Sequence, residues 1–178
     1  VQTCALPISG TTNVVGKSLY FGEYPQNKVT DEALRSQLEN AAFVENKTTV
    51  DGIVYYKKDF GWNRYDYYAL NSIEWIVLEE SSSSYLLLSK KILEIRAFGD
   101  AFWNDSEIRT WLNNDFFDAA FSSTDQADVL TTSNSTFYWP YDDAYIEGAP
   151  GSTAVTNDKV FLLDLNDVTN GAYGFAEN

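Results

Sequence analysis

A stripe of large apolar residues between positions 108 and 121 has to be buried against another part of the fold. Ile108, Trp111 and Leu112 recur at i, i+3 and i+4, which is the spacing of one face of an α-helix. The Ser106 hydroxyl can cap this helix, predicted over 107–113. A second helical turn, predicted over 115–121, extends the same apolar face with Phe116, Ala120 and Phe121. We expect Asn-rich breaks between short helices, which together cover one face of a sheet.

Two β-hairpins are predicted before the stripe. Runs rich in β-forming residues at 50–57 and 64–70 flank a loop at 58–63. Residues 73–79 then alternate in polarity, turn at 80–84, and return as an apolar strand at 85–88. Antiparallel pairs of this kind predict a meandering sheet.

The remaining segments predict short elements. We expect a strand at 18–21, turn chemistry at 22–26, and a helix over 31–39 capped by Thr30. Ser123 and Gln126 have capping-box spacing for another helix. A long loop over 131–153, a strand at 160–163 and a short capped element at 164–170 complete the prediction. The fold class is therefore α+β: a twisted antiparallel β-sheet with short flanking helices.

The first eight residues match the translation of a common sequencing adapter, codon by codon. We therefore interpret 1–8 as an adapter-derived artefact of metagenomic origin, 9–17 as a linker, and 18–178 as a single α+β domain. Cys4, the one cysteine, lies within the artefact segment. The remaining sequence has neither Cys nor His, which excludes thiol, imidazole and Cys/His zinc chemistry there.

Charge and hydropathy exclude further partners. A net charge of -14 disfavours nucleic acid, because phosphate backbones repel an acidic surface. No apolar run reaches the length of about 18 residues that a membrane-spanning helix needs, so no membrane insertion is expected in this segment. We expect no cofactor and no resident metal.

Several short motifs fail on spacing. Gly16-Lys17-Ser18 resembles the end of a phosphate-binding loop, but the glycine spacing is wrong and a strand follows. Asp142-Asp143 and Asn157-Asp158 offer oxygen ligands for Ca²⁺ or are solvated turn residues. Glu79 and Glu80 are neighbours on a strand, so they point to opposite faces and cannot flank one glycosidic bond.

An aromatic segment inside the expected long loop is the sequence's best candidate for ligand binding. Aromatic rings beside carboxylates on a loop can stack on a sugar ring and accept hydrogen bonds from its hydroxyls. Packing of the loop on its own domain is the alternative. The candidate residues are Tyr138, Trp139, Tyr141, Asp142, Asp143 and Tyr145.

A set of spaced motifs makes the chain resemble a bacterial family known as domain of unknown function 6273. The resemblance covers Tyr20 to about Phe175 and has no catalytic residues to transfer. Its motifs include Phe21-Gly22-Glu23-Tyr24-Pro25-Gln26, Leu86-Leu87-Leu88-Ser89-Lys90 and Asp158-Lys159-Val160-Phe161-Leu162-Leu163. Its structural landmarks are Trp75, Trp103, Arg109, Trp111, Leu112, Asn113, Phe116 and Phe121.

The resemblance carries implications for fold and extent. Family members are similar to the C-type-lectin-like fold of formylglycine-generating enzymes, whose chemistry uses cysteines that this chain lacks. They also continue into Trp-Leu-Arg-Ser and Gly-Val-Arg-Pro segments that do not occur here. We therefore expect a domain truncated at its C-terminus.

Three functional hypotheses follow. The leading one is a non-catalytic binding or interaction module of a bacterial surface or secreted protein, with a carbohydrate or another protein as partner. The second is a carboxylate-dependent hydrolase, which requires an Asp or Glu with a raised pKa in a cleft. The third is a purely structural spacer domain.

Overall fold

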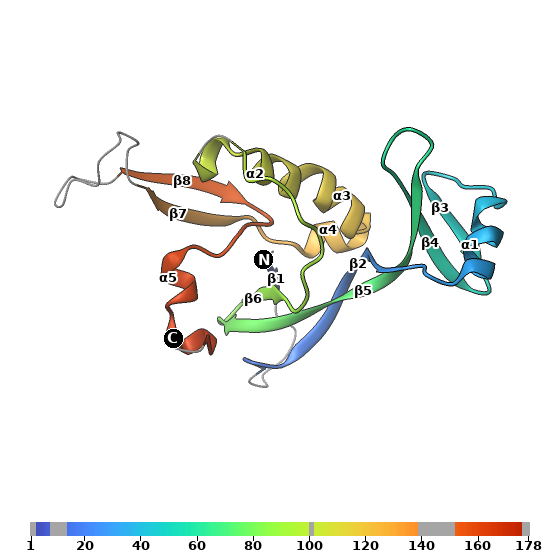
Figure 1. Ribbon diagram of the computed structural model, residues 1–178. Helices are drawn as coiled ribbons and strands as arrows, with labels where there is room; N and C mark the ends of the chain where they lie inside the picture. Colours follow the sequence, from blue (N-terminus) through green and yellow to red (C-terminus); the bar gives the residue numbers. More distant parts are fainter. Residues whose placement is uncertain (1–2, 8–13, 100–101, 139–151, 176–178) are drawn as a thin grey trace. The chain divides into compact units, whose positions relative to one another are not determined.

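The computed structural model describes residues 3–7, 14–99, 102–138 and 152–175 (Figure 1). The chain divides into two compact units. The first, here called the core unit, comprises Val1–Leu19 and Glu74–Asn178. The second, here called the hairpin unit, comprises Tyr20–Ile73. Both are α+β with antiparallel strand pairing, which confirms the predicted fold class.

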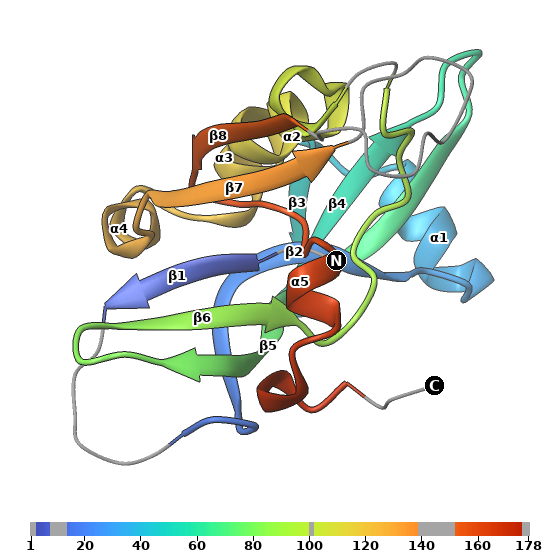
Figure 2. The same cartoon turned by 90° about the vertical axis from the view of Figure 1, so that its left-hand side faces the viewer.

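The core unit contains a three-stranded arrangement, a two-stranded sheet and several short helices (Figure 2). Strand β6 (Ser84–Ser89) pairs with β1 (Thr3–Pro7) and with the Trp75–Glu80 part of β5 (Tyr65–Glu80). β7 (Thr132–Tyr138) pairs with β8 (Ser152–Asp158). The helices are η1 (Trp103–Asp105), α2 (Glu107–Trp111), η2 (Leu112–Phe116), α3 (Phe117–Ala120), α4 (Ser123–Asp128), α5 (Leu165–Val168) and η3 (Gly171–Tyr173).

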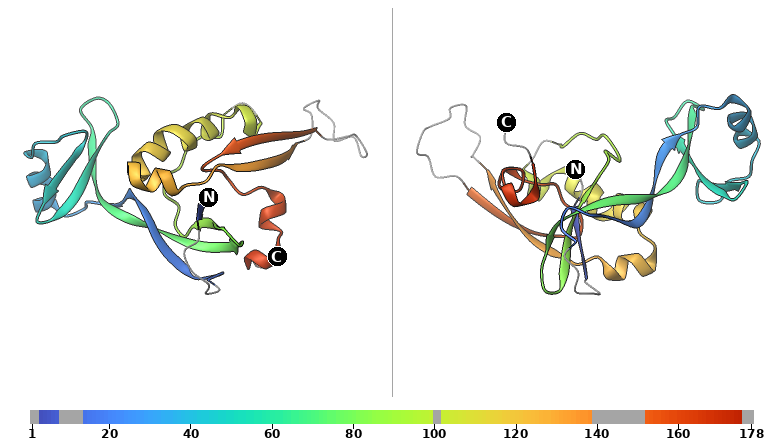
Figure 3. Two further views of the ribbon diagram at one scale, coloured as in Figure 1. Left: turned by 180° about the vertical axis from the view of Figure 1, so that it is seen from behind. Right: turned by 90° about the horizontal axis from the view of Figure 1, so that it is seen from below.

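The hairpin unit has its own strands and one helix. β3 (Lys47–Val50) pairs with β4 (Ile53–Asp59), and β4 pairs with the Tyr65–Ala69 part of β5. β2 (Ser18–Lys28), which also pairs with β5, begins in the core unit and continues into this one. Helix α1 (Glu32–Glu39) lies beside the β3–β4 hairpin (Figure 3).

The predicted apolar stripe packs as expected. Leu112 and Phe116 are completely buried, and Trp111 is nearly so. The ring of Phe121 stacks on that of Trp75 in β5, with centroids 6.3 Å apart. Phe116 meets the edge of the Phe121 ring at 6.2 Å. The helical segment therefore covers the sheet of its own unit, as the sequence predicted.

One expectation about this segment is wrong: Asn113 and Asn114 do not break the helix. α2, η2 and α3 form one continuous rod in Figure 1, with η2 as a single π-helical stretch. The two asparagine amides donate to the carbonyls of Arg109 (3.1 Å) and Thr110 (2.6 Å), four residues back. The wider π turn accommodates both side chains while the apolar face stays buried.

The expected long loop over 131–153 is also wrong in part. β7 and β8 form a ladder from Thr132↔Asp158 to Tyr138↔Ser152. Conversely, the strand predicted at 160–163 does not form, although Val160 and Phe161 are buried. β7 is rich in Ser, Thr and Asn and has no alternation of apolar and polar residues. Its pairing with β8 makes it a strand, so hydrophobic periodicity could not predict it.

A small cluster forms the core of the hairpin unit. Leu38 of α1 is completely buried against Val50, Tyr55 and Tyr67. Asp31, rather than the predicted Thr30, caps α1, because its Oδ1 accepts the Leu34 amide at 2.7 Å. Asp is a strong N-cap residue that also suits the helix dipole.

Three further boundaries differ from prediction. Residues 22–26 lie inside β2 rather than in a turn, and Gly22 has a left-handed backbone with a φ of 67°. The capping box of α4 uses Ser122 and Asp125, one residue before the predicted pair. Thr3–Pro7, which we excluded from the fold, pairs with β6 as β1. β1 therefore covers the edge of β6 that would otherwise be unpaired.

Candidate functional site

The ligand-binding residues proposed from the sequence lie almost entirely outside the described residues. Trp139, Tyr141, Asp142, Asp143 and Tyr145 fall there. Tyr138 is the last residue of β7, and its side chain is likewise not described. These residues therefore remain a prediction.

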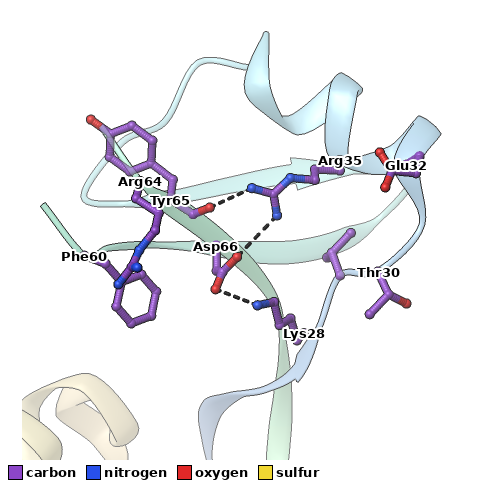
Figure 4. Close-up of a pocket in the computed structure, with 9 residues that line it drawn as sticks. Lys28, Thr30, Glu32, Arg35, Phe60, Arg64, Tyr65 and Asp66 are labelled. Carbon is purple, nitrogen blue, oxygen red and sulfur yellow. Dashed lines mark hydrogen bonds and ion pairs between the residues drawn. The ribbon is translucent and has the colours of Figure 1, made fainter. Parts of the chain in front are cut away.

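The described part of the hairpin unit contains a groove of about 650 Å³. Three segments meet at it: the end of β2 with the residues after it, the first half of α1, and the β4–β5 hairpin (Figure 4). All of them belong to one unit. The lining residues are Lys28, Val29, Thr30, Glu32, Arg35, Phe60, Arg64, Tyr65 and Asp66.

Asp66 organises one wall of the groove. Its Oδ2 accepts Lys28 Nζ at 2.7 Å, and its Oδ1 accepts Arg35 Nη1 at 3.3 Å. The hydrogen bond from Lys28, opposed by desolvation and aided by Arg35, lowers the pKa of Asp66. Both carboxylate oxygens are thus already occupied by the protein's own cations.

Arg35 is similarly committed. Besides Asp66, its guanidinium pairs with Glu39 (3.4 Å) and donates to the Tyr65 carbonyl (2.8 Å). It also lies 5.6 Å from the centroid of the Tyr67 ring. With its N–H groups directed at three partners, Arg35 holds α1 to β5 and has little capacity left for a ligand.

Arg64 differs from Arg35. Its guanidinium carbon lies 5.2 Å from the centroid of the Phe60 ring, and Figure 4 shows the guanidinium lying across that ring. Within the described residues no carboxylate lies within ion-pair distance of it. This contact with the ring face uses none of the N–H donors of the guanidinium, so they stay available for a ligand.

Trp62 lies between Phe60 and Arg64 in the same loop and has an exposed fraction of 101%. The loop is closed by the Phe60 amide on the Arg64 carbonyl (2.9 Å) and by the Gly61 amide on Asp59 Oδ1 (2.7 Å). Gly61, Trp62 and Asn63 all have positive φ, at 76°, 56° and 55°. A left-handed backbone is unfavourable for Trp, so the loop displays this side chain at an energetic cost.

The sequence landmarks gather in the core unit, around a buried ion pair. Asp158 has an exposed fraction of 1% and accepts Arg109 Nε at 2.7 Å. Its second oxygen accepts the Trp103 indole N–H (3.1 Å) and the Asn134 amide (3.2 Å). Asp158 is therefore neither a solvated turn residue nor an open calcium ligand, since its oxygens are filled by the protein itself.

Asn113 links the same helix to the chain after β8. Its Oδ1 accepts the amides of Lys159 (2.8 Å) and Val160 (3.2 Å), and its Nδ2 donates to the Val160 carbonyl (2.8 Å). The backbone of Lys159 and Val160 is thus hydrogen-bonded by the Asn113 side-chain amide instead of by a neighbouring strand. Arg109, Asn113 and Asp158 thus join the helix to β8 and to the chain that follows it.

A carboxyl with a raised pKa exists in the core unit. Burial raises the pKa of Asp167, helped by the charges of Asp164 and Glu79. Asp164 and Asp167 each accept the other's amide at 3.0 Å, which caps α5. Tyr173 donates to Glu79 Oε2 at 2.9 Å, and burial together with Glu79 raises the pKa of Tyr173 to about 12. Helix capping accounts for this arrangement without a substrate.

Two classes of site find no support in the described segments. No group of three or more Asp, Glu, Cys or His residues there has the arrangement to hold a metal ion. Nor does that part of the chain include a helix of the length and hydropathy that a membrane span requires.

Comparison with known proteins bears on the core unit. The family model described as domain of unknown function (DUF6273) matches residues 82–177, more than half of the chain. The chain belongs to the DUF6273 family. Neither a curated protein nor a solved structure matches it. The matched DUF6273 region lies wholly in the core unit and contains the landmarks from Trp103 to Phe121, whereas Trp75 precedes it.

The groove lies outside the matched DUF6273 region, and sequence reasoning did not find it. Its cations come from positions 28, 35 and 64, and nothing in their spacing indicates that they meet. One signal was present: a Trp between Gly61 and Asn63 in a predicted hairpin loop, where a buried core residue is not expected.

Proposed function

We propose that this protein is a non-catalytic binding module of a bacterial surface or secreted protein, and that the groove in the hairpin unit is its ligand site. The observation that carries the proposal is Trp62, fully exposed in a loop with left-handed backbone. Trp62 does not line the groove of about 650 Å³, but it lies in the chain between two residues that do, Phe60 and Arg64. Strained, exposed residues persist where function requires them. A structural spacer has no need of such a residue.

The chemistry of the groove suits binding better than catalysis. Asp66 is held ionised by Lys28 and Arg35, so it is neither a general acid nor a free nucleophile. The lining rings of Phe60 and Tyr65 each carry a cation, Arg64 and Lys57, so the exposed ring of this loop is that of Trp62, and the lining cations supply several donors. Such a combination of aromatic faces and hydrogen-bonding groups suits a carbohydrate.

Glycan-array binding by the full chain, with Trp62→Ala as the probe variant, tests the proposal. We expect the variant to lose about tenfold or more in affinity for any glycan that the wild type binds. Tyr20→Ala is the matched control, because Tyr20 is an exposed aromatic of the same unit (68%) that lies outside the loop between Phe60 and Arg64. Equal binding by wild type and Trp62→Ala would remove Trp62 from the site and with it the observation on which the proposal rests.

We also propose, from the family resemblance, that the core unit has a C-type-lectin-like fold. Its antiparallel strands and short flanking helices are consistent with that fold at the level of class. An experimental structure of a longer form of the protein, compared with known C-type-lectin-like domains, tests this. A different strand order would exclude it.

A further inference from the structure

We infer that the groove selects a saccharide bearing a carboxylate, with Arg64 as the residue that pairs with that group. This inference rests on the proposed function and names its ligand class. It follows from which polar groups at the groove are already committed and which are not.

Each carboxylate oxygen of Asp66 already has a cation of the protein as its partner. Lys28 occupies one oxygen of Asp66 and Arg35 the other. Arg35 is in turn committed to Glu39 and to the Tyr65 carbonyl. A ligand therefore meets this wall as a neutralised, hydrogen-bonded surface rather than as a free carboxylate.

The uncommitted charged groups are mainly donors. Arg64 contacts the Phe60 ring, and no ion pair of Arg64 occurs in the described part of the chain. Lys28 directs one of its three N–H donors to Asp66, and its side chain is half exposed (50%). Glu32 is the acidic lining residue outside the Asp66 network. Three cations and two carboxylates line the groove, and Arg64 is the lining cation that has no ion pair among the described residues.

These cations contrast with the overall charge of the protein. The chain has a net charge of -14, with twelve Lys and Arg residues in all. Three of those twelve line this one groove. Because charges separated by more than about 10 Å are largely screened at 0.1 M salt, a bound anion responds mainly to the nearby cations.

The geometry favours a carboxylate attached to a ring. The planar guanidinium of Arg64, which contacts the Phe60 ring, can present two parallel N–H groups to a carboxylate. Trp62, two residues before Arg64, offers an unoccupied aromatic face to the apolar side of a sugar ring. Glu32 and the free donors of Lys28 can bond to ring hydroxyls.

The test is titration calorimetry of the full chain with a galacturonic acid trisaccharide and with its fully methyl-esterified form. The ester keeps the rings and removes the charge. We expect the acid to bind about tenfold tighter than the ester, since the carboxylate of the acid accepts charge-assisted hydrogen bonds that the ester does not. High salt should narrow this difference.

Arg64→Gln should weaken binding of the acid far more than binding of the ester, so that the preference for the acid is lost. Lys47→Gln is the matched control, because it removes one exposed cation of the same unit outside the groove. Arg64→Lys, which keeps the charge without the fork, should show an intermediate preference. Circular dichroism of each variant establishes that it is folded.

The contrary outcomes separate the two proposals. Equal affinity for acid and ester, both lost in Trp62→Ala, would overturn the carboxylate inference and leave the binding module intact. No binding of either trisaccharide together with an empty glycan array would overturn both. Tighter, Arg64-dependent binding of a tetra-glutamate peptide than of the acid trisaccharide would overturn the saccharide assignment.

Discussion

The two units of this protein differ in the exposure of the tryptophans that the structure describes. In the core unit, Trp75, Trp111, Phe116 and Phe121 are buried and contact one another. In the hairpin unit, Trp62 is fully exposed and Phe60 is partly exposed under Arg64. All five non-glycine residues with positive φ among the described residues also lie in the hairpin unit. The family match covers the packed unit and leaves out the unit with displayed side chains.

We interpret this difference as a division of roles, in which the core unit provides stability and the hairpin unit provides the binding surface. In the core unit most of the large aromatic side chains are buried and stabilise the fold. The hairpin unit accepts backbone strain and unburied apolar surface, which is typical of a binding surface. Substitutions should therefore have effects of different kinds in the two units, and the following predictions test that.

The largest expected effect is on packing in the core unit. Phe116→Ala should reduce the free energy of unfolding by about 3–5 kcal/mol, because a fully buried ring leaves a cavity among aromatic neighbours. Urea denaturation followed by far-UV circular dichroism measures this. Phe98→Ala, at a partly exposed Phe of the same unit (44%), is the control and should cost much less. Equal costs would contradict the packing account.

The second effect concerns the buried ion pair of the core unit. Asp158→Asn should destabilise the fold by about 3 kcal/mol, because Arg109 would keep its charge in a partly buried position without its partner. Glu74→Gln is the matched control: the Glu74–Lys90 pair is partly solvated, and its loss should matter much less than the loss of Asp158. The same denaturation experiment measures both, and a silent Asp158→Asn would show that the network is dispensable.

The third effect has the opposite sign and belongs to the hairpin unit. Trp62→Asn should raise the free energy of unfolding by about 1 kcal/mol, because Asn tolerates a left-handed backbone better than Trp. The same variant should lose ligand binding. A gain in stability with loss of binding is what a residue retained for function predicts. Unchanged stability and binding would mean that Trp62 is a neutral surface residue.

The smallest effect is an opposite response to pH in the two units. The lowered pKa of Asp66 means that its ion pairs stabilise the fold above its ordinary value of 3.8, and that this contribution disappears as the pH falls through the lowered value. The raised pKa of Asp167 means the reverse. Its contribution is present below 3.8 and is lost as the pH rises through the raised value.

Carboxyl carbon NMR titration measures both groups directly. We expect the Asp66 signal to titrate below 3.8 and the Asp167 signal above it. Lys28→Gln should move the Asp66 value upward, since the hydrogen bond from Lys28 is the largest cause of its shift. Titration of Asp167 at or below the ordinary value would contradict its burial.

The sequence predicted the parts of the fold that depend on local periodicity. The stripe at Ile108, Trp111 and Leu112 and the hairpin between β5 and β6 both follow from spacing alone. β7 and β8 escaped prediction because their strand character comes from pairing with each other rather than from an apolar pattern. The buried role of Asp158 was equally hidden, since Arg109 lies 49 positions away.

The candidate site was harder to predict than the fold. Arg35 on α1 meets Asp66 on β5 only after α1 has packed on the β3–β4 hairpin. No spacing rule connects residues brought together in this way. Only Trp62 could be noticed in the sequence, because a Trp is unusual between Gly61 and Asn63 in a predicted hairpin loop.

The most direct test of the division between the units is the ¹H–¹⁵N spectrum of the tryptophan indoles, recorded while galacturonic acid trisaccharide is added to the full chain. Our account predicts that the Trp62 signal shifts with saturation. The signals of Trp75, Trp103 and Trp111 should stay in place, because these side chains are buried in the core unit. Saturable shifts at Trp103 or Trp111 with an unmoved Trp62 would place the site in the core unit and contradict the account.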